Sequence, residues 1–410
     1  MVSSASRSAW ENSWGIARNN EPLGTIRPTV ASYCTTFLKP EMLHIYRQVT
    51  GLQRYDTFVV AQQRQSHDKF PFDKVEVTRK PQSNFVRRFW LKYVKREPPI
   101  VYRGEYGVLE KILNRRGADL LHVYFGHTGV HLLPFIRRWR RPAIVSFHGM
   151  DVQQREDQPG YVEKLRDLLG VLPLVLARSH SLRDRLIDLG CPEEKIRINR
   201  TGIPMGRFPV AERAFPGDGA WRFVQACRLI EKKGLDVALK AFAEFAGRYP
   251  KSHFTIAGEG PLLAEMEQLS GELGVADKVT FAGFLDESSL GKLYAESHVF
   301  VHPSQLTEDQ NQEGVPNSML EGMATGLPVA ATLHGGIPEA VANGETGILV
   351  PERDFKGLTK ALFSFASDAQ RWEQFSAAAA RSVREQFEQC AQIAKLESFY
   401  DEAIEIPAKA

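Results

Sequence analysis

The sequence lacks the long apolar segment that a membrane-spanning helix requires. None of its apolar runs approaches about 18 residues, and the longest have the length of a buried strand. The beginning of the chain, MVSSASRSAWENSWG, lacks the apolar core of a secretory signal, so secretion is not expected. Cysteine is scarce, and the four residues show no metal-ligand spacing (Cys34, Cys191, Cys227 and Cys390). We therefore expect free thiols in a reducing, cytoplasmic compartment.

Net charge is small overall but large in each half. The 410 residues carry a formal charge of +3 at neutral pH, yet residues 1–200 carry +13 and residues 201–410 carry −10. The composition is 43% hydrophobic and 25% charged, which excludes wholesale disorder. A chain of this length is expected to form two or three domains of roughly 100–200 residues. The charge asymmetry indicates domains with different partners.

Short β-branched runs alternate with amphipathic helical stretches along almost the whole chain. This alternation predicts an α/β fold with parallel sheets covered on both faces. Residues 201–219 are rich in Pro and Gly and are the best linker candidate, which predicts doubly wound domains over residues 1–205 and 206–390. Ligands of such sheets bind outside the carboxyl ends of the strands, so we expect the site in the cleft between the domains. The expected strands are 26–33, 57–61, 120–125, 143–147, 174–177, 196–199, 222–227, 253–257, 279–282, 299–302, 328–331 and 347–350.

The strongest motif is EGVPNSMLEGMATGLPVAAT, residues 313–332. It predicts a helix over 316–325, with Pro316 in its first turn and Gly326 as its left-handed cap. With a helical rise throughout, Glu313 and Glu321 would lie ~12 Å apart along the axis. That is too far for an acid–nucleophile pair on one glycosidic bond, which needs roughly 5–9.5 Å. The spacing suits two contacts to an elongated ligand, and the alternative is a surface helix with two solvated glutamates.

Three further features of this half point to the same sheet edge. CRLIEKKG (227–234) follows the first predicted strand of the half and places Arg228 and Lys233 at its carboxyl end, where a guanidinium and an ammonium suit a diphosphate. AGEGP (257–261) follows the second strand and allows backbone to approach a ligand closely. The N–H groups at the start of the predicted helix favour an anion and belong to Gly314, Val315 and Asn317.

These motifs together resemble the retaining GT-B glycosyltransferases of family 4. RLIEKKG, AGEGP, FAGFLDESSL, VHPSQ and Glu313-x7-Glu321 followed by GLPVAATLHGGIPE occur in the family's order over nearly the whole second domain. The resemblance implies that Glu313 binds donor-sugar hydroxyls, Glu321 the ribose, and Arg228 and Lys233 the donor diphosphate. It further implies sugar contacts from backbone around Gly314, Val315 and Asn317, and a nucleotide base near Gly260 and Phe284. Residues 391–410 are expected to pack back on the first domain.

The first half offers weaker signals of the same function. VSFHGMD (145–151) places His148 at the end of an apolar strand, which resembles the family's sugar-facing histidine, although a structural histidine is the alternative. HVYFGHTGVHL (122–132) offers His127 and Gly129 for the acceptor side, with packing as the alternative. Residues 35–52 resemble the first loop and helix of the exopolysaccharide-type branch but lack its Ser-Glu-Thr-Phe run.

The resemblance implies metal-independent transfer of a hexose from a nucleotide sugar, with retention of configuration. UDP-sugars are favoured over GDP-sugars, no cofactor is expected, and Glu313, His148, Arg228 and Lys233 are the catalytic candidates. The acceptor expected is a glycan or lipid-linked glycan hydroxyl of a bacterial surface polysaccharide. A soluble small-molecule acceptor and a non-catalytic nucleotide-sugar-binding module remain the alternatives.

Basic and aromatic residues alternate in two segments of the first half, NFVRRFWLKYVKREPP (84–99) and FIRRWRRP (135–142). Such segments suit an anionic membrane surface, here the inner face of the plasma membrane. The alternative is a solvated helix with buried aromatics. Nucleic acid is not expected, because no nucleic-acid-binding motif accompanies the charge and the acidic half would repel phosphates.

Overall fold

The computed structural model describes residues 27–39, 42–78, 85–96, 106–152, 160–308 and 313–407, without the side chains of Phe85, Arg87 and Met150. These residues form two compact units. The first contains the described parts of 1–145, 171–174 and 393–410, and the second those of 146–170 and 175–392. The predicted domain boundary at residues 205 and 206 stays a prediction. All four cysteines are free thiols.

A seven-stranded sheet has the order β3-β2-β1-β4-β5-β6-β7. Its resolved ladders, such as β1 with β2 and β1 with β4, are parallel. The strands β4 and β5 are buried along their whole length, as expected for a sheet covered on both faces. The strands are β1 (Thr29–Phe37), β2 (Asp56–Arg64), β3 (Val75–Val77), β4 (Leu120–Tyr124), β5 (Ala143–Phe147), β6 (Val175–Ala177) and β7 (Ile196–Ile198).

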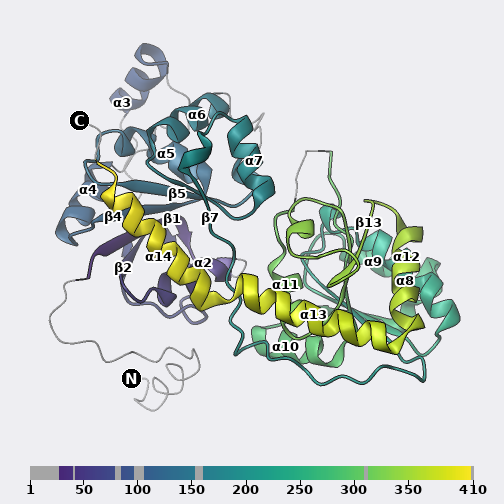
Figure 1. The fold of residues 1–410 in the computed structure, drawn as a ribbon. Helices are drawn as coiled ribbons and strands as arrows, with labels where there is room; N and C mark the ends of the chain where they lie inside the picture. Colours follow the sequence, from purple (N-terminus) through teal and green to yellow (C-terminus); the bar gives the residue numbers. More distant parts are fainter. Residues whose placement is uncertain are drawn as a thin grey trace. The chain divides into compact units, whose positions relative to one another are not determined.

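The helices connecting these strands are short. The π-helical turn Trp90–Val94 directly follows the end of α3 at Phe89. The helices are α2 (Leu43–Gly51), α3 (Phe85–Phe89), α4 (Tyr106–Arg115), α5 (Gly126–Ile136), α6 (Tyr161–Val171) and α7 (His180–Asp188) (Figure 1).

A six-stranded parallel sheet in the second unit has the order β10-β9-β8-β11-β12-β13. Both sheets therefore show the Rossmann-type order, in which the direction of winding reverses beside the first strand. In the six-stranded sheet that switch point lies between β8 and β11. Its strands are β8 (Arg222–Ala226), β9 (His253–Ala257), β10 (Val279–Gly283), β11 (Val299–His302), β12 (Val329–Thr332) and β13 (Gly347–Val350).

The two faces of the six-stranded sheet are covered by different helices. Phe223 packs in a buried cluster with residues of α8 and α12, whereas its neighbour Val224 packs with residues of α11 and α13. Successive side chains of a strand point to opposite faces, so one strand supplies both layers. The helices are α8 (Leu235–Arg248), α9 (Leu263–Glu272), α10 (Glu287–Glu296), α11 (Asn317–Ala324), α12 (Phe355–Ser367) and α13 (Ala369–Phe387) (Figure 1).

The expected linker, residues 201–219, is fastened to the second unit rather than free. Ile203 N–H donates to Phe387 O, and Gln389 N–H donates to Ile203 O. The Arg213 guanidinium donates to the carbonyls of Ser297 and Tyr294 at 2.8 and 2.9 Å. Burial lowers the pKa of Arg213 to about 10. The segment is therefore a packed connection.

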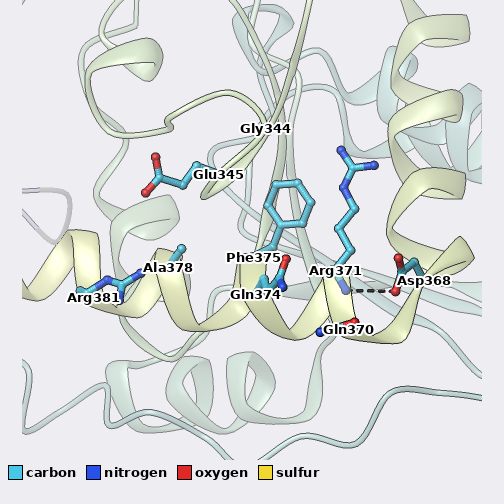
Figure 2. Close-up of a pocket in the computed structure, with 9 residues that line it drawn as sticks. All are labelled: Gly344, Glu345, Asp368, Gln370, Arg371, Gln374, Phe375, Ala378 and Arg381. Carbon is cyan, nitrogen blue, oxygen red and sulfur yellow. Dashed lines mark hydrogen bonds between the residues drawn. The ribbon is translucent and has the colours of Figure 1, made fainter.

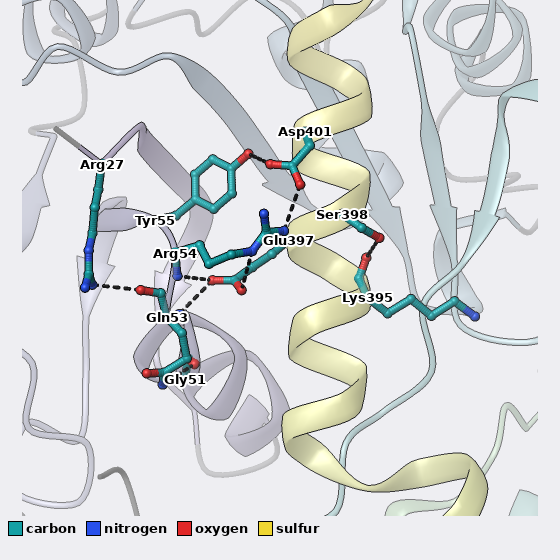
Figure 3. A network of polar contacts seen from close by, with 9 residues as sticks. All are labelled: Arg27, Gly51, Gln53, Arg54, Tyr55, Lys395, Glu397, Ser398 and Asp401. Atoms are coloured by element: carbon teal, nitrogen blue, oxygen red, sulfur yellow. Dashed lines mark hydrogen bonds and ion pairs between the residues drawn. The ribbon is translucent and has the colours of Figure 1, made fainter. Parts of the chain in front are cut away.

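The last helix, α14 (Gln389–Glu405), is fixed to the first unit by polar contacts with the residues just before β2 (Figure 3). Glu397 is buried and accepts from the N–H groups of Gln53 and Arg54 at 2.6 and 2.7 Å. Asp401 accepts from the Arg54 guanidinium at 2.8 Å and from the Tyr55 hydroxyl at 2.6 Å. A carboxylate that accepts from backbone N–H groups removes the cost of burying them. Residues 393–407 therefore complete the first unit.

Candidate functional site

The turn after β8 is held rigidly at the switch point of the six-stranded sheet. The Gln225 side chain donates to Lys233 O at 2.9 Å, and Gln305 N–H, after β11, donates to Lys232 O at 2.9 Å. Gly234 has φ +59°, and a Cβ there would lie 1.9 Å from Pro303 O, so only glycine fits. The Gln225 side chain of β8 and the backbone after β11 thus place the two lysines at the carboxyl edge, where ligands of such sheets bind.

Glu313 lies against these two lysines. Its Oε2 is 2.5 Å from Lys233 Nζ and 3.7 Å from Lys232 Nζ, and all three side chains are at least 87% buried. Burial alone would raise the pKa of Glu313, but Lys233 and Lys232 outweigh it and lower the pKa to about 2. Glu313 is therefore ionised at neutral pH and can accept hydrogen bonds from hydroxyls.

The loop that carries Glu313 is fixed by its own backbone. Glu313 N–H donates to His334 Nε2 at 2.9 Å, and Glu313 O accepts from Gly336 N–H at 3.2 Å. A Cβ at Gly336 would lie 2.8 Å from the carbonyl carbon of Gly314, which shows how closely the turn after β12 approaches this loop. The carboxylate thus projects from a loop held at both its N–H and its C=O.

Helix α11 follows this loop and carries the second glutamate. It begins at Asn317 and has Pro316 at its N-cap, while Gly326 adopts φ +90° after its end. The predicted helix is confirmed, but Glu313 precedes it, so the ~12 Å separation assumed from a continuous helical rise is not supported. Ser318 Oγ donates to Ala226 O at 2.5 Å and ties the helix to the end of β8. Glu321 lies on the same helix and is 7% exposed.

The AGEGP turn packs directly on the CRLIEKKG turn. Leu229 N–H donates to Glu259 O at 2.9 Å, and a Cβ at Gly260 would lie 2.4 Å from Leu229 O. Gly258 N–H donates to Gly283 O, which places the end of β10 beside the same turn. Phe284, the next residue, is 56% exposed. The structure thus gathers Gly260 and Phe284 at the edge that also carries Lys233, with Arg228 exposed on the adjoining turn.

His148 lies at the carboxyl end of β5, on the seven-stranded sheet. The N–H groups of His148 and Gly149 donate to Asp151 Oδ1 at 2.9 Å each, which fixes the backbone of the turn. The Arg178 guanidinium lies 3.2 Å from His148 Nδ1. Burial lowers the pKa of Arg178 to about 10, with Asp151 opposing the shift. The ring of His148 is therefore oriented by a buried cation.

His127 and Gly129 lie in the first turn of α5, directly after β4. Gly129 N–H donates to Phe125 O, and the His127 ring stacks on Phe125 with centroids 5.6 Å apart. Phe125 adopts φ +75°, which turns the chain sharply from strand into helix. Strand β4 lies at the switch point of its sheet, so these residues occupy the position equivalent to that of the loop after β11.

Comparison with known proteins gives two consecutive family matches. Residues 43–207 match the family model described as Glycosyltransferase Family 4, and residues 213–382 match that described as Glycosyl transferases group 1. A colanic acid biosynthesis glycosyltransferase, WcaL of Salmonella typhimurium strain LT2, is 32% identical over 66% of this chain and 68% of its own length. The chain belongs to the family 4, group 1 glycosyltransferases. The predicted family is thereby confirmed.

Two further proteins extend the comparison. A GDP-mannose-dependent alpha-(1-6)-phosphatidylinositol monomannoside mannosyltransferase of Mycolicibacterium smegmatis is 31% identical over 62% of this chain and 69% of its own length. The first curated relatives are matched over 60–69% of their length. The structure of HepE from Anabaena in complex with UDP superposes with a TM-score of 0.73 at 17% identity, covering 92% of this chain and 100% of HepE. The expected GT-B fold is thereby confirmed.

Several residues that shape the candidate site of this family 4 glycosyltransferase were not predicted from the sequence. Lys232 accompanies Lys233 beside Glu313, and Gln225 and Gln305 hold the lysine turn. His334 contacts the Glu313 backbone. His334 follows an apolar strand, as His148 does, so the same signal could have identified it. Gln305 belongs to the quoted VHPSQ motif, although no role was assigned to it, whereas Gln225 gave no sequence signal.

A hollow elsewhere on the second unit contains none of the predicted site residues (Figure 2). It lies beside Gly344 and Glu345, before β13, and beside the first half of α13. The amino ends of parallel strands form the edge opposite the predicted donor site, so this hollow is separate from that site. Its lining residues are Gly344, Glu345, Asp368, Gln370, Arg371, Gln374, Phe375, Ala378 and Arg381.

No group of three or more His, Cys, Asp or Glu side chains among the described residues is arranged to hold a metal ion. In the same part of the chain, no helix is both long enough and apolar enough to cross a bilayer.

Proposed function

We propose that this glycosyltransferase moves a hexose from a nucleoside-diphosphate sugar to a glycan or lipid-linked glycan hydroxyl, with retention of configuration. The observation that supports this most is the contact between Glu313 and the two lysines at the switch point of the six-stranded sheet. A carboxylate and two ammonium groups at one sheet edge match the hydroxyls and the diphosphate of such a donor.

In the proposed reaction, Lys233 and Arg228 bind the diphosphate and Glu313 accepts hydrogen bonds from sugar hydroxyls. The bond between the anomeric carbon and the diphosphate breaks, and the acceptor oxygen forms a new bond on the same face of the sugar. The acceptor proton leaves with the diphosphate. The lysines, Arg228 and the amino end of α11 stabilise the negative charge that develops on the leaving group. These side chains supply the positive charge, and the proposal includes no metal.

The nucleotide proposed is uridine diphosphate, with guanosine diphosphate as the alternative. HepE was solved with UDP, whereas the mycobacterial relative is named as GDP-mannose-dependent. Glu321 is assigned to the ribose because it lies in the second turn of α11, on the helix tied to β8 by Ser318. The exposed ring of Phe284, next to the AGEGP turn, is assigned to the base.

The acceptor proposed belongs to the synthesis of a bacterial surface polysaccharide. WcaL is named for colanic acid, and the mycobacterial relative for a phosphatidylinositol glycolipid. We assign the acceptor side to the carboxyl edge of the seven-stranded sheet, which carries His148, His127 and Gly129. A soluble acceptor is the alternative.

Helix α3 and the π-helical turn after it suit contact with an anionic membrane. Residues 85–96 contain five cations and no acidic residue. Side chains at the spacing of one helix face are at least half exposed, which argues against the alternative of buried aromatics. Aromatic and basic groups presented together favour the headgroup region of a bilayer. These exposed side chains are Val86, Phe89, Trp90, Tyr93 and Val94.

The experiment that tests the donor proposal is a panel of nucleotide sugars assayed by thermal shift and by transfer. A ligand at 100 times its dissociation constant stabilises a protein by about 2.7 kcal/mol. We expect a UDP-sugar to give the largest shift, and the same sugar to appear in product with retained configuration. Tight binding with neither transfer nor slow donor hydrolysis would instead support a binding module. Absence of any shift across the panel would overturn the proposal.

Flotation with liposomes tests the membrane part separately. The double variant Arg88→Glu/Lys92→Glu should lose binding to vesicles containing anionic lipid, because both charges on the exposed helix are reversed. The variant Arg371→Glu/Arg381→Glu, which reverses two cations of α13, is the matched control. Equal flotation of wild type and the α3 variant would exclude this helix as the contact.

A further inference from the structure

A buried histidine connects the loop that carries Glu313 to the segment after β13, the edge strand of the six-stranded sheet. His334 follows β12 and is 1% exposed as a side chain. Its Nε2 accepts from Glu313 N–H at 2.9 Å, and its Nδ1 lies 2.6 Å from Glu352 Oε1, after β13. One imidazole therefore bridges the loop of Glu313 and a carboxylate two strands away from β11.

The hydrogen-bond partners of the His334 ring determine which of its two nitrogens carries the hydrogen. A backbone N–H can only donate, so Nε2 must present its lone pair to Glu313. The neutral ring then has its hydrogen on Nδ1, where it donates to Glu352. The Glu352 pKa is lowered, because the Leu306 N–H at 2.7 Å, His334 and Arg353 outweigh the effect of burial. The carboxylate thus accepts from His334 with one oxygen and from Leu306 with the other.

The same contacts connect the two parts of the candidate donor site, the lysine turn after β8 and the loop that carries Glu313. Leu306 directly follows Gln305, whose N–H donates to Lys232 O and whose side chain donates to Glu231 O at 3.2 Å. The segment 305–306 therefore holds the lysine turn on one side and Glu352 on the other. Through His334, Glu352 in turn fixes the backbone from which the Glu313 side chain projects.

We propose that His334 and Glu352 are positioning residues for Glu313, and that they set how well the enzyme binds the sugar part of its donor. The inference rests on the proposed function, in which Glu313 contacts the sugar while Glu321, Arg228 and Lys233 contact the nucleotide. Without the His334 contact, the Glu313 N–H is left buried and the loop shifts. A displaced carboxylate weakens sugar contacts, whereas the nucleoside diphosphate contacts stay in place, because Gln225 and Gln305 hold the backbone of the lysine turn independently of Glu313.

Two substitutions of His334 separate its two hydrogen bonds. A glutamine amide reaches the position of Nε2, so His334→Gln keeps an acceptor for Glu313 N–H. An asparagine amide reaches only the position of Nδ1, so His334→Asn keeps a donor for Glu352 and loses the contact to Glu313. Misplacement of a reacting or binding group by about 1 Å can cost 10²-fold in rate. We expect kcat/KM to fall about 10- to 100-fold in His334→Asn and about threefold or less in His334→Gln.

Binding measurements identify which part of the donor is affected. In His334→Asn, calorimetry should show about tenfold weaker binding of the nucleotide sugar, while binding of the nucleoside diphosphate alone changes by no more than about twofold. Glu352→Ala should show the same pattern. The matched control is His253→Asn, since His253 also makes one side-chain hydrogen bond, to Thr280 at 2.8 Å, but lies at the amino end of β9.

The outcomes distinguish this inference from the proposed function. If wild type neither binds nor transfers a nucleotide sugar, the proposed function fails. If wild type does both and His334→Asn matches wild type in kcat/KM and in both affinities, the positioning role is wrong. Equal weakening of nucleotide and nucleotide sugar in a folded His334→Asn would also overturn it, because that result indicates general damage to the site. Thermal unfolding of each variant checks the fold.

Discussion

The carboxyl edges of the two sheets share a topology but differ in their side chains. Both sheets have the Rossmann-type strand order, so each offers a crevice at its switch point. On the six-stranded sheet, two lysines and a carboxylate lie in short contact, and several loops hold them. On the seven-stranded sheet, His148 is held by backbone contacts to Asp151 and by the Arg178 guanidinium. The fold provides two crevices, and the charges decide which one suits a diphosphate.

The largest effect is expected when a cation is removed from the carboxyl edge of the six-stranded sheet, which tests whether the charges there bind the diphosphate. Lys233→Ala should lower transfer about 10²- to 10³-fold, the loss typical when a group that stabilises developing negative charge is removed. Steady-state transfer assays measure it. Lys278→Ala, which removes the lysine of an ion pair with Asp277 in the turn before the amino end of β10, is the control and should retain wild-type transfer. Wild-type transfer by Lys233→Ala would place the diphosphate elsewhere.

The buried carboxylate on that edge should also make stability depend on pH. The Glu313 pKa falls from 4.5 to about 2 in the fold. A lowered pKa stabilises the folded state above pH 4.5 and ceases to do so as pH falls toward 2. Glu313→Gln should therefore unfold more easily than wild type at neutral pH, by about 3 kcal/mol, because buried lysine charge loses its partner.

Urea unfolding at several pH values measures this difference. The gap between wild type and Glu313→Gln should shrink as pH falls from 4.5 toward 2. A gap that stays constant over this interval would show that the ion pair does not contribute through the charge of Glu313.

A buried carboxylate on the first unit should affect stability without affecting the donor. Glu397→Ala leaves the N–H groups of Gln53 and Arg54 without their acceptor, and an unsatisfied buried group costs about 1–3 kcal/mol. We expect the free energy of unfolding to fall by about 2 kcal/mol, with nucleotide-sugar binding unchanged at temperatures where the variant is folded. Ser398→Ala, on the exposed face of α14, should cost far less. Loss of donor affinity in folded Glu397→Ala would contradict this separation.

The smallest effect is expected at the carboxyl edge of the seven-stranded sheet. His148→Ala removes one side chain that can hydrogen-bond a neutral hydroxyl, a contact that contributes about 1 kcal/mol, so transfer should fall roughly fivefold. Calorimetry should show nucleoside diphosphate affinity equal to that of wild type. A loss of that affinity as large as in Lys233→Ala would remove the distinction between the two edges.

The strands could be predicted from the sequence because largely apolar runs such as 143–147 and 299–302 are buried on both faces. Strand β3 (Val75–Val77) was missed, since three residues with a central glutamate form no apolar run and are defined only by pairing with β2. The lysine turn and the Glu313 motif were also predicted. Their mutual contact was not, because it depends on loops separated by 80 residues in sequence.

The residues that position the site were hard to predict for a related reason. Gln225 lies inside β8, where a polar side chain in an apolar strand gives no indication of its partner. Glu352 follows β13 and looks like an ordinary loop charge until the sheet order places it beside His334. Such contacts are set by strand order, which the sequence pattern alone does not determine.

The fastening of α14 to the first unit has a consequence for synthesis. Arg54 and its partner Asp401 are 347 residues apart, so the ribosome makes nearly all of the second unit before the first unit receives its last helix. A nascent chain emerges from its amino end, and domains usually fold in that order. Here the first unit stays incomplete until α14 has been made, and the Gln53 and Arg54 amides and the Tyr55 hydroxyl are exposed until then. The six-stranded sheet already has all its strands at that point. A chain cut after Phe387 should therefore retain a folded six-stranded sheet and yield a first unit that proteases degrade.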